Sequence, residues 1–319
     1  MENTHVILLD KPLAIKHAEE LDKRIFFISS HIHQFKLITG ETTINGVEVT
    51  LQPGTDPEEI KTKITSVIDN EIALQKVLPP RVVWKSSDNV PQFQDELFDK
   101  MLEQEMVFEM GEGQVCFGEK LIYLMDALDQ MIKDMTISNF GATEYRYPTL
   151  ISTNALEKCG YFKSFPHFLM FVTRLHNDID IYRDFLEDYK SNNGIGSYLL
   201  PYCQNVDYCL PPTMCYHTYY QFQNTQHAET HNRVITSIGK SFRYESKYHR
   251  TLERLWDFSI REIVFMGSRD FVLDSRHKFM EAAFSLFEKL GLEGHCEVAS
   301  DPFFCSEDTA AKIFNQRMQ

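Results

Sequence analysis

The sequence has no apolar stretch that approaches the ~20 consecutive residues of a membrane-spanning helix. It also shows no secretory signal, because MENTHVILLDK places acidic and polar residues before a short apolar run. Its seven cysteines include no CxxC pair, and Cys203, Cys209 and Cys215 follow one another at equal spacing without forming a zinc-knuckle pattern. These absences indicate a protein without membrane spans and with reduced thiols, which we expect in the cytoplasm.

Positive charge is also scarce. The chain has 32 Lys and Arg against 46 Asp and Glu, which gives a formal net charge of -14. A general nucleic-acid binder must neutralise phosphates, so this balance argues against such a binder and against tRNA as a partner. A local basic pocket remains compatible with the composition, and the 43% of hydrophobic residues suffice for a sizeable core.

A dinucleotide-binding fingerprint is missing as well. Gly111, Gly113 and Gly118 form a GxGxxxG run, but this run follows a helical pattern instead of a strand. We therefore predict that residues 111–120 form a loop without a phosphate-binding role.

Composition and periodicity divide the chain into two regions. Residues 1–90 are expected to form a small α/β extension of unknown role, residues 91–319 the main domain, and the polar segment 86–92 the linker. Asp56 and Pro57 are typical of a helix start, as N-cap and first helical residue. The elements predicted in the first region are strands at 6–10, 24–30, 34–38, 46–53 and 81–86 and a helix at 56–78.

His31 and His33 are predicted to lie on one face of a strand, where two imidazoles could form a metal pair. No third ligand is nearby in the sequence, so ordinary strand histidines are the simpler interpretation.

The second region mixes amphipathic helices with short strands. Residues 121–135 carry a continuous apolar stripe, which suits either a core or a dimer surface. A polar excursion is expected at 176–197. The other predicted elements are helices at 94–110, 154–162, 269–292 and 306–319 and strands at 142–151, 168–175 and 295–304.

The stretch 241–266 has the chemistry of a binding face. Two predicted strands flank a basic loop, and the two-residue period places Arg243 and Glu245 on one face of the first strand. The same period places four side chains on one face of the second strand: Trp256, Phe258, Ile260 and Glu262. The loop and its borders add the basic residues Lys247, His249, Arg250 and Arg254. A guanidinium, carboxylates and an aromatic ring suit a nucleoside triphosphate. The alternative is a surface hairpin with ordinary cross-strand ion pairs.

Together these stretches resemble a known family. The helix 121–135 with a strand ending at Pro148 is similar to motif 1 of the class II aminoacyl-tRNA synthetases, and Phe242-Arg243-x-Glu245 followed by Arg254-x-x-x-Phe258 is similar to their motif 2. YPTLISTNALEKCGYFKSFPHF, LPPTMCYHTYYQF, RLWDFSIREIVFMGS and ASDPFF look like the atypical seryl-tRNA synthetase homologues called amino acid:[carrier protein] ligases. The resemblance covers roughly residues 93–319 and implies an α+β fold with an antiparallel sheet flanked by helices.

The resemblance also implies a site. Arg243 would bind the α-phosphate of ATP as the catalytic cation, Glu245 would accept from the adenine amino group, Phe258 would stack on adenine, and Arg254 would be a further ATP-binding residue. Cys215 and Glu262 match two of three protein ligands of a Zn²⁺ ion that holds the substrate's α-amino group. Mg²⁺ would accompany ATP.

The implied reaction is activation of a small amino acid by ATP and its transfer to the phosphopantetheine thiol of a carrier protein. A homodimer is expected.

One departure from the family pattern concerns the C-terminal part. A further zinc-binding cysteine and the Gly-rich motif 3 with its ATP-binding arginine are expected after the stretch matching ASDPFF, whereas Cys296 and Cys305 lie in no such context and the sequence ends at Gln319. The sequence leaves open a truncated or split ligase, a differently supplied third ligand, a non-catalytic synthetase-like binding module, and a tRNA synthetase paralogue.

Overall fold

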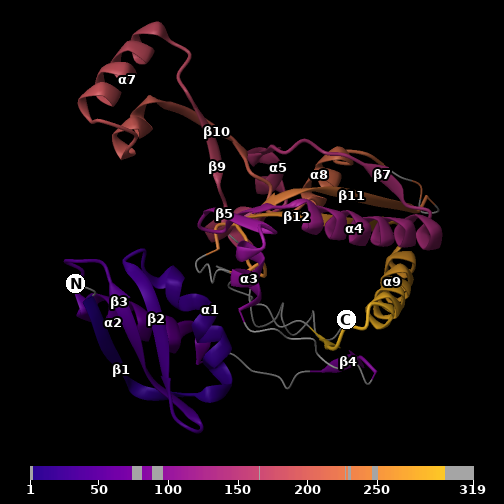
Figure 1. The fold of residues 1–319 in the computed structure, drawn as a ribbon, viewed down its shortest axis with the longest axis horizontal. Helices are drawn as coiled ribbons and strands as arrows, with labels where there is room; N and C mark the ends of the chain where they lie inside the picture. The colour runs from indigo at the N-terminus through magenta and orange to yellow at the C-terminus, as the bar shows by residue number, and fades with distance from the viewer. Residues whose placement is uncertain are drawn as a thin grey trace. The chain divides into compact units, whose positions relative to one another are not determined.

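A computed structural model gives the fold and divides the chain into two compact units, which among the described residues are 3–83 with 296–298, and 84–295. Both units mix helices with antiparallel strands, which confirms the predicted α+β class (Figure 1). No helix in the described part is long and apolar enough to cross a bilayer. The residues that the structure describes are 3–73, 81–87, 96–164, 166–226, 228, 231–245 and 251–298.

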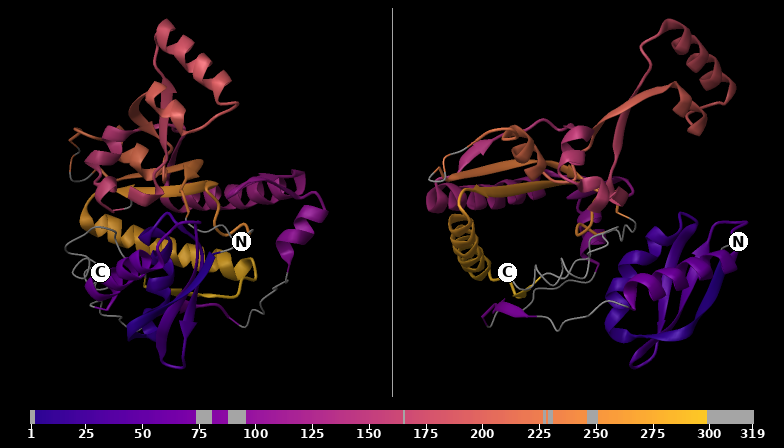
Figure 2. Two further views of the ribbon diagram at one scale, coloured as in Figure 1. Left: turned by 90° about the vertical axis from the view of Figure 1, so that its left-hand side faces the viewer. Right: turned by 180° about the vertical axis from the view of Figure 1, so that it is seen from behind.

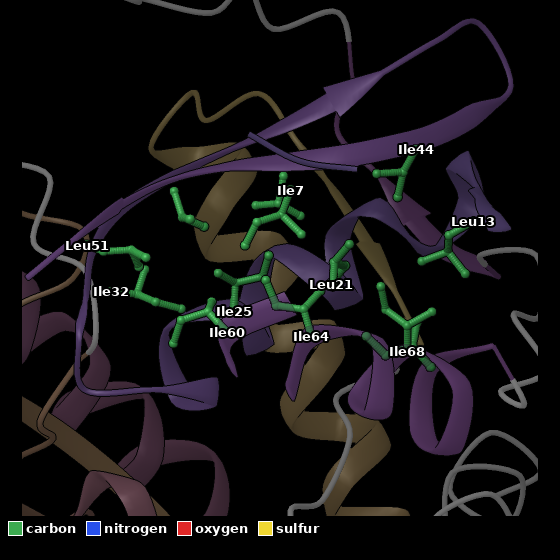
Figure 3. Packing of buried hydrophobic residues seen from close by; sticks show 13 residues of the cluster. Ile7, Leu13, Leu21, Ile25, Ile32, Ile44, Leu51, Ile60, Ile64 and Ile68 are labelled. Atoms are coloured by element: carbon green, nitrogen blue, oxygen red, sulfur yellow. The ribbon is translucent and has the colours of Figure 1, made fainter. Parts of the chain in front are cut away.

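The N-terminal unit is a three-stranded antiparallel sheet in the order β1-β3-β2 with its own hydrophobic core (Figure 3). Val47, Val49 and Leu51 of the central strand are buried in alternation, and they share this core with Ile60 and Ile64 of a helix. The elements of the unit are β1 (Asn3–Ala14), η1 (Ile15–His17), α1 (Ala18–Ile28), β2 (Ile32–Thr39), β3 (Thr43–Leu51), α2 (Pro57–Val67) and the π-helical η2 (Ile68–Ile72).

The predicted start of α2 is confirmed. Asp56 Oδ1 accepts the backbone N–H of Glu58 at 3.0 Å, and Pro57 is the first helical residue. The strand predicted at 24–30 is wrong, because these residues fall mostly in α1. Leu21 and Ile25 lie one turn apart and are fully buried, so the helical period across 18–28 decides the structure of this apolar run.

The two histidines do not share a strand face as predicted. His33 lies exposed on β2, whereas His31 precedes that strand in a turn. There the Nδ1 atom of His31 is 2.9 Å from Oε1 of Gln52. The contact with Gln52 therefore positions His31 in the turn, and His31 does not form the predicted pair with His33 on a strand face.

The second unit contains most of the elements that match the synthetase motifs. Its main sheet has the order β12-β11-β7, with β11 and β12 antiparallel and β7 parallel to β11, and a second sheet has the order β8-β10-β9. From β4 onward the elements are β4 (Val82–Lys85), α3 (Leu97–Glu103), β5 (Val107–Gly111), β6 (Gln114–Phe117), α4 (Glu119–Phe140), β7 (Thr143–Tyr145), β8 (Ile151–Ser152), α5 (Thr153–Lys158), α6 (Tyr161–Ser164), η3 (Pro166–Phe168), β9 (Phe171–Leu175), α7 (Ile179–Ser191), η4 (Ser197–Tyr202), β10 (Cys203–Cys209), α8 (Cys215–Gln221), β11 (Arg233–Phe242), β12 (Asp257–Met266), α9 (Arg269–Lys289) and β13 (His295–Glu297).

The two faces of the main sheet are covered by different helices. On one face Phe265 contacts Phe140 of α4 and Phe279 of α9, with ring centroids 5.3 and 6.5 Å apart. Side chains alternate along a strand, so Phe258 and Glu262 project from the opposite face. The start of α8 packs on that face, as the contacts of Met214 and Thr213 described below show.

The helix predicted at 121–135 is confirmed and is longer than predicted. It ends at Gly141, whose φ of +63° closes the helix in the left-handed conformation. Several apolar side chains in its first half are exposed in the single chain, namely Ile122, Tyr123, Leu124 and Met125. Its role as a homodimer surface stays a prediction.

Residues 94–120 differ from the prediction. The helix expected over 94–110 is α3 alone, which is followed by Glu105 at a positive φ of 54° and then by β5. The loop expected over 111–120 contains β6, which pairs with β5 in an antiparallel hairpin. The apolar–polar–apolar order of Phe108, Glu109 and Met110 and the glycines near the turn favour a hairpin here over a continued helix.

The polar excursion predicted at 176–197 is confirmed in position. It leaves the sheet after β9, contains α7 and returns through η4 into β10, and Figures 1 and 2 show α7 at the end of this ribbon. The helix predicted over 269–292 is α9, followed by Gly291 at a φ of +69°. Predictions for 306–319, and for the loop cations Lys247, His249 and Arg250, lie outside the described residues.

Candidate functional site

The β11–β12 pair provides the floor of the candidate site. Phe258 and Glu262 of β12 lie opposite Ser241 and Ser237 of β11, both small and buried. Between them lies Gly239, where an added Cβ would stand 2.6 Å from Cε of Met214. A glycine on β11 therefore lets the segment before α8 approach the sheet closely.

This close approach brings Cys215 next to Glu262, although 47 residues separate them in sequence. Thr213 links them: its hydroxyl donates a short hydrogen bond to Oε1 of Glu262, and its Oγ1 lies 3.8 Å from Sγ of Cys215. The Oε2 atom of Glu262 is buried and has no hydrogen-bond partner of normal geometry among the described residues. The two side chains that the resemblance pairs are thus neighbours in the fold.

Burial disfavours the charged forms of both groups. It raises the pKa of Glu262, and hydrogen bonds from the Met214–Cys215 segment and the charge of Arg243 offset this only in part. Burial, and then the charge of Glu262, raise the pKa of Cys215 to about 11. A cation between them would favour both charged forms, and thiolate with carboxylate suits zinc.

A third protein ligand is not found among the described residues. No group of three or more His, Cys, Asp or Glu side chains that could hold a metal ion occurs within the residues that the structure describes. The pair of Cys215 and Glu262 fits two coordination positions of a zinc ion, and the described residues do not complete the set.

Arg243 lies just beyond the end of β11, not on the strand as predicted. Its Nε donates to the carbonyl oxygen of Pro212 at 3.1 Å, and its Cζ lies 5.4 Å from the centre of the Phe258 ring. Its positive charge also lowers the pKa values of Glu262 and Tyr161 against the effect of burial. The guanidinium is therefore at the centre of the site, against the ring predicted to stack on adenine.

Glu245 and Arg254, which are both predicted to bind ATP, also lie close together. Arg254 Nη1 lies 3.6 Å from Oε2 of Glu245, whose side chain is 13% exposed against 60% for Arg254. Burial raises the pKa of Glu245, and the charges of Arg254 and Arg243 act in the opposite direction. Glu245 is thus a largely buried acceptor beside an exposed cation.

Backbone hydrogen bonds hold the segment 243–245 in place. Arg243 N donates to the carbonyl oxygen of Trp256 at 3.0 Å, and Tyr244 N donates to that of Phe168 at 3.1 Å. The Tyr244 and Trp256 rings lie 4.7 Å apart. The motif 2 residues are therefore fixed by three separate parts of the chain, including the carbonyl of Pro212.

Sequence reasoning missed several residues of this site. Thr213 is two residues from Cys215, and this proximity was its only sequence signal. Tyr161 is 4% exposed, lies edge to face against Tyr216 at 5.4 Å and feels the charges of Arg243 and Glu245, but no pattern identifies it. Its partners come from distant segments, which only the fold brings together.

The known proteins that this chain resembles are ligases and tRNA synthetases. No protein-family model matches the chain. It is 28% identical over 197 residues to a type-2 serine–tRNA ligase of Methanococcus aeolicus, which covers 61% of this chain and 38% of that ligase. It is 30% identical over 224 residues to an amino acid–[acyl-carrier-protein] ligase of Bradyrhizobium diazoefficiens, which covers 70% of this chain and 66% of that ligase.

A solved structure shows the same fold over almost the whole chain. The complex of M. kandleri SerRS with A. aeolicus tRNASec matches with a TM-score of 0.66 and 17% identity, covering 94% of this chain and 58% of that chain. This chain spans 38% of the length of the M. aeolicus serine–tRNA ligase. The chain belongs to the class II aminoacyl-tRNA synthetase family, among the homologues of type-2 serine–tRNA ligases and amino acid–[acyl-carrier-protein] ligases.

Proposed function

We propose that this protein activates a small amino acid with ATP and transfers it to the phosphopantetheine thiol of a carrier protein. The observation that carries the proposal is the position of Arg243 between Phe258, the Pro212 carbonyl and the Cys215–Glu262 pair. The similarity to an amino acid–[acyl-carrier-protein] ligase supports the choice of acceptor.

The first step forms an aminoacyl-adenylate. A carboxylate oxygen of the amino acid attacks the α-phosphorus of ATP, the new O–P bond forms, and pyrophosphate leaves. Such chemistry needs positioning and charge stabilisation more than a protein nucleophile. Arg243 would stabilise the charge on the α-phosphate, Phe258 would stack on adenine, and Glu245 would accept from its amino group while Arg254 holds that carboxylate and contacts ATP.

In the second step the sulfur of the carrier's thiol attacks the carbonyl carbon of the adenylate. A thioester forms and AMP leaves. Mg²⁺ bound with ATP supplies charge neutralisation in this scheme. Among the described residues, Arg243, Glu245 and Phe258 would orient the nucleotide.

Cys215 and Glu262 are proposed ligands of a zinc ion that would hold the substrate's amino group. Their adjacency and the unpartnered Oε2 of Glu262 support this assignment. Thr213 would orient the carboxylate through its hydroxyl. Because every amino acid has an amino group, selection would depend on pocket size.

Tyr216 and Tyr219 lie near this pair. Cys215 and Glu262 both raise the pKa values of Tyr216 and Tyr219, secondarily to burial, and each pKa reaches about 12. Their hydroxyls are therefore neutral near pH 7, and their rings are bulky and hold one another edge to face at 6.1 Å. We propose that these walls exclude large amino-acid side chains.

Amino-acid-dependent pyrophosphate–ATP exchange tests the proposal. Arg243→Ala is expected to lower exchange by roughly 10²–10³-fold, as for the loss of one charge-stabilising donor. Lys240→Ala is the matched control, because Lys240 is a cation on the same hairpin that pairs with Asp257 at 2.9 Å, away from the site. Unchanged exchange in Arg243→Ala would contradict the assignment, and ATP binding without exchange in the wild type would favour a non-catalytic binding module.

tRNA aminoacylation is the second candidate, because type-2 serine–tRNA ligases match the chain and a tRNA-bound SerRS shares its fold. The net charge of -14 argues against it. A gel shift with tRNA that weakens with salt, together with charging of tRNA, would support this candidate over the carrier protein.

The cellular setting and assembly belong to the same proposal. We propose a cytoplasmic homodimer with the catalytic core at 91–319 and a separate N-terminal extension at 1–90. Sedimentation of the purified chain tests the dimer.

A further inference from the structure

The Gly-rich run that lacks a dinucleotide fingerprint makes a close contact with the candidate site. Gly113 lies at the turn of the β5–β6 hairpin with a φ of +65°, a conformation that favours glycine. Its carbonyl oxygen accepts the backbone N–H of Trp256 at 2.8 Å. A Cβ added to Gly113 would stand 2.4 Å from Cγ of the Trp256 ring. Only a residue without a side chain fits between hairpin and indole.

Trp256 in turn contacts the proposed ATP-binding segment. The carbonyl oxygen of Trp256 accepts the N–H of Arg243 at 3.0 Å, and its ring lies 4.7 Å from that of Tyr244. Trp256 therefore uses its N–H toward the hairpin and its carbonyl toward Arg243. Its Nε1 is buried with no hydrogen-bond partner among the described residues, so packing, not a polar bond, holds the ring.

The other end of the hairpin is equally constrained. Gly118 N donates to the carbonyl oxygen of Met106 at 2.8 Å, and an added Cβ at Gly118 would stand 2.8 Å from the carbonyl oxygen of Glu105. Gly118 is also the N-cap of α4. The hairpin thus connects the start of α4 to Trp256 without an intervening loop.

We propose that the β5–β6 hairpin positions Arg243, with Gly113 and Trp256 as positioning residues that set the guanidinium relative to the α-phosphate of ATP. This inference rests on the proposed function. Because small displacements of a charge-stabilising group cost up to about 10²-fold in rate, loss of the Gly113–Trp256 contact should reduce ATP use without altering the Cys215–Glu262 pair.

The test compares two alanine variants that share backbone strain but differ in the clash. Gly113→Ala adds a Cβ at a φ of +65° against Trp256, whereas Gly141→Ala adds one at a φ of +63° with nothing within 4 Å. Amide hydrogen exchange of residues 243–245 is measured in the full chain. We expect faster exchange in Gly113→Ala and wild-type exchange in Gly141→Ala, and equal exchange in both variants would overturn the proposed coupling.

Kinetics test the consequence for ATP. In pyrophosphate–ATP exchange, Gly113→Ala should lower kcat/KM for ATP by on the order of 10²-fold, with the KM for the amino acid unchanged. Faster amide exchange with unchanged kcat/KM for ATP would overturn the positioning role. If wild type has no exchange activity, the proposed function fails, and the amide exchange still decides the coupling.

A second variant tests the same contact if Gly113→Ala folds poorly. Trp256→Leu removes the indole while both backbone hydrogen bonds can remain. It should speed amide exchange at 243–245, as Gly113→Ala does.

Fluorescence of Trp256 gives an independent test. Trp84→Phe leaves Trp256 as the sole tryptophan, since the chain has two. A change of Trp256 emission on addition of ATP supports the coupling, and a constant emission counts against it.

Discussion

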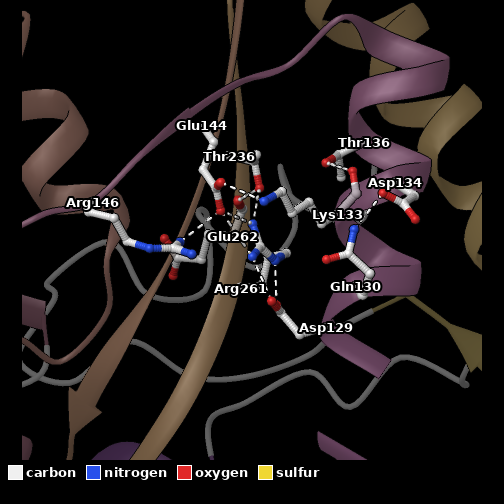
Figure 4. Close-up of polar contacts among 10 residues, drawn as sticks. All are labelled: Asp129, Gln130, Lys133, Asp134, Thr136, Glu144, Arg146, Thr236, Arg261 and Glu262. Atoms are coloured by element: carbon white, nitrogen blue, oxygen red, sulfur yellow. Dashed lines mark hydrogen bonds and ion pairs between the residues drawn. The ribbon is translucent and has the colours of Figure 1, made fainter. Parts of the chain in front are cut away.

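Arg261 of β12 binds Asp129 of α4 in a two-pronged ion pair, with Nε bonded to Oδ1 and Nη2 to Oδ2, the latter at 2.7 Å (Figure 4). The side chain of Arg261 is 3% exposed, and Glu144 of β7 completes its surroundings at 3.2 Å. Arg261 precedes Glu262 directly and projects from the opposite face of the strand. The helix that resembles motif 1 is therefore joined through one buried guanidinium to the strand that carries a proposed zinc ligand.

Asp129→Ala tests how much this ion pair contributes to stability. Removing one partner of a buried ion pair leaves a charge without full compensation, so we expect a loss of about 3–5 kcal/mol in the free energy of unfolding. Urea denaturation of the full chain measures this loss. The control is Asp274→Ala, which breaks the exposed pair with Lys278 at 2.7 Å and should cost under about 1 kcal/mol. Similar losses in both variants would show that the buried pair contributes no more than a surface one.

The stability of the N-terminal unit should depend on its own hydrophobic core. Ile64 is fully buried among the residues of the sheet and α1, so Ile64→Ala should destabilise this unit by about 2–5 kcal/mol. Amide exchange in β1, β2 and β3 reports the loss. Leu8→Ala, at a side chain 61% exposed on β1, should change exchange little. Equal exchange in the two variants would contradict the described core.

The acidity of Cys215 predicts its reactivity in protein prepared without metal. Its pKa of about 11 lies above the ordinary value of 9.0, so the thiol is protonated near pH 8 and alkylates slowly. Glu262→Gln removes a negative charge that raises this pKa, and alkylation by iodoacetamide should become faster. Mass spectrometry follows it, with Cys159 as control because burial alone raises its pKa. A rate at Cys215 that does not respond to Glu262→Gln would argue against the described adjacency.

The same pKa gives a direction for stability. Because the folded-state pKa is raised, the protonated thiol is favoured by the fold, and its contribution is fully present below pH 9. That contribution should be lost as the pH rises through about 11. A Cys215→Ser variant should show a smaller loss of unfolding free energy over this window than wild type does.

Zinc removal and replacement test the proposed ligands. Wild-type protein should contain stoichiometric zinc, Cys215→Ser should lose most of it, and rebinding to the stripped wild type should release a proton from the thiol. Elemental analysis and proton-release titration measure these effects. Protein without zinc, or zinc unaffected by Cys215→Ser, would refute the assignment. Cys116→Ser changes an exposed thiol and serves as control.

Local signals predicted elements well where the residues determine their own conformation. Asp56 and Pro57 set the start of α2 by local hydrogen bonding and a fixed φ, and the sequence pattern alone identified them. Residues 24–30 were mistaken for a strand because this apolar run was interpreted without Leu21, which lies one helical turn before Ile25. Its helical state depends on Leu21 and Ile25 packing against distant segments.

The site was predictable only in part for the same reason. The resemblance paired Cys215 with Glu262, and the structure places them together, yet no periodicity joins residues so far apart. The contact between Gly113 and Trp256 depends on how two hairpins meet. Such long-range relationships follow from tertiary packing and leave no mark in spacing.

The polar excursion at 176–197, which contains α7, has a consequence for how the family can diverge. Leu175 and Cys203 pair at its base, and His176 N donates to the carbonyl oxygen of Tyr202 at 3.0 Å, so the sheet register is closed before the excursion begins. Each doubling of a loop's length costs only about 0.6 kcal/mol. Relatives can therefore lengthen, shorten or replace this segment at little cost to the strands, which makes it a place where the sequence can change independently of the main sheet.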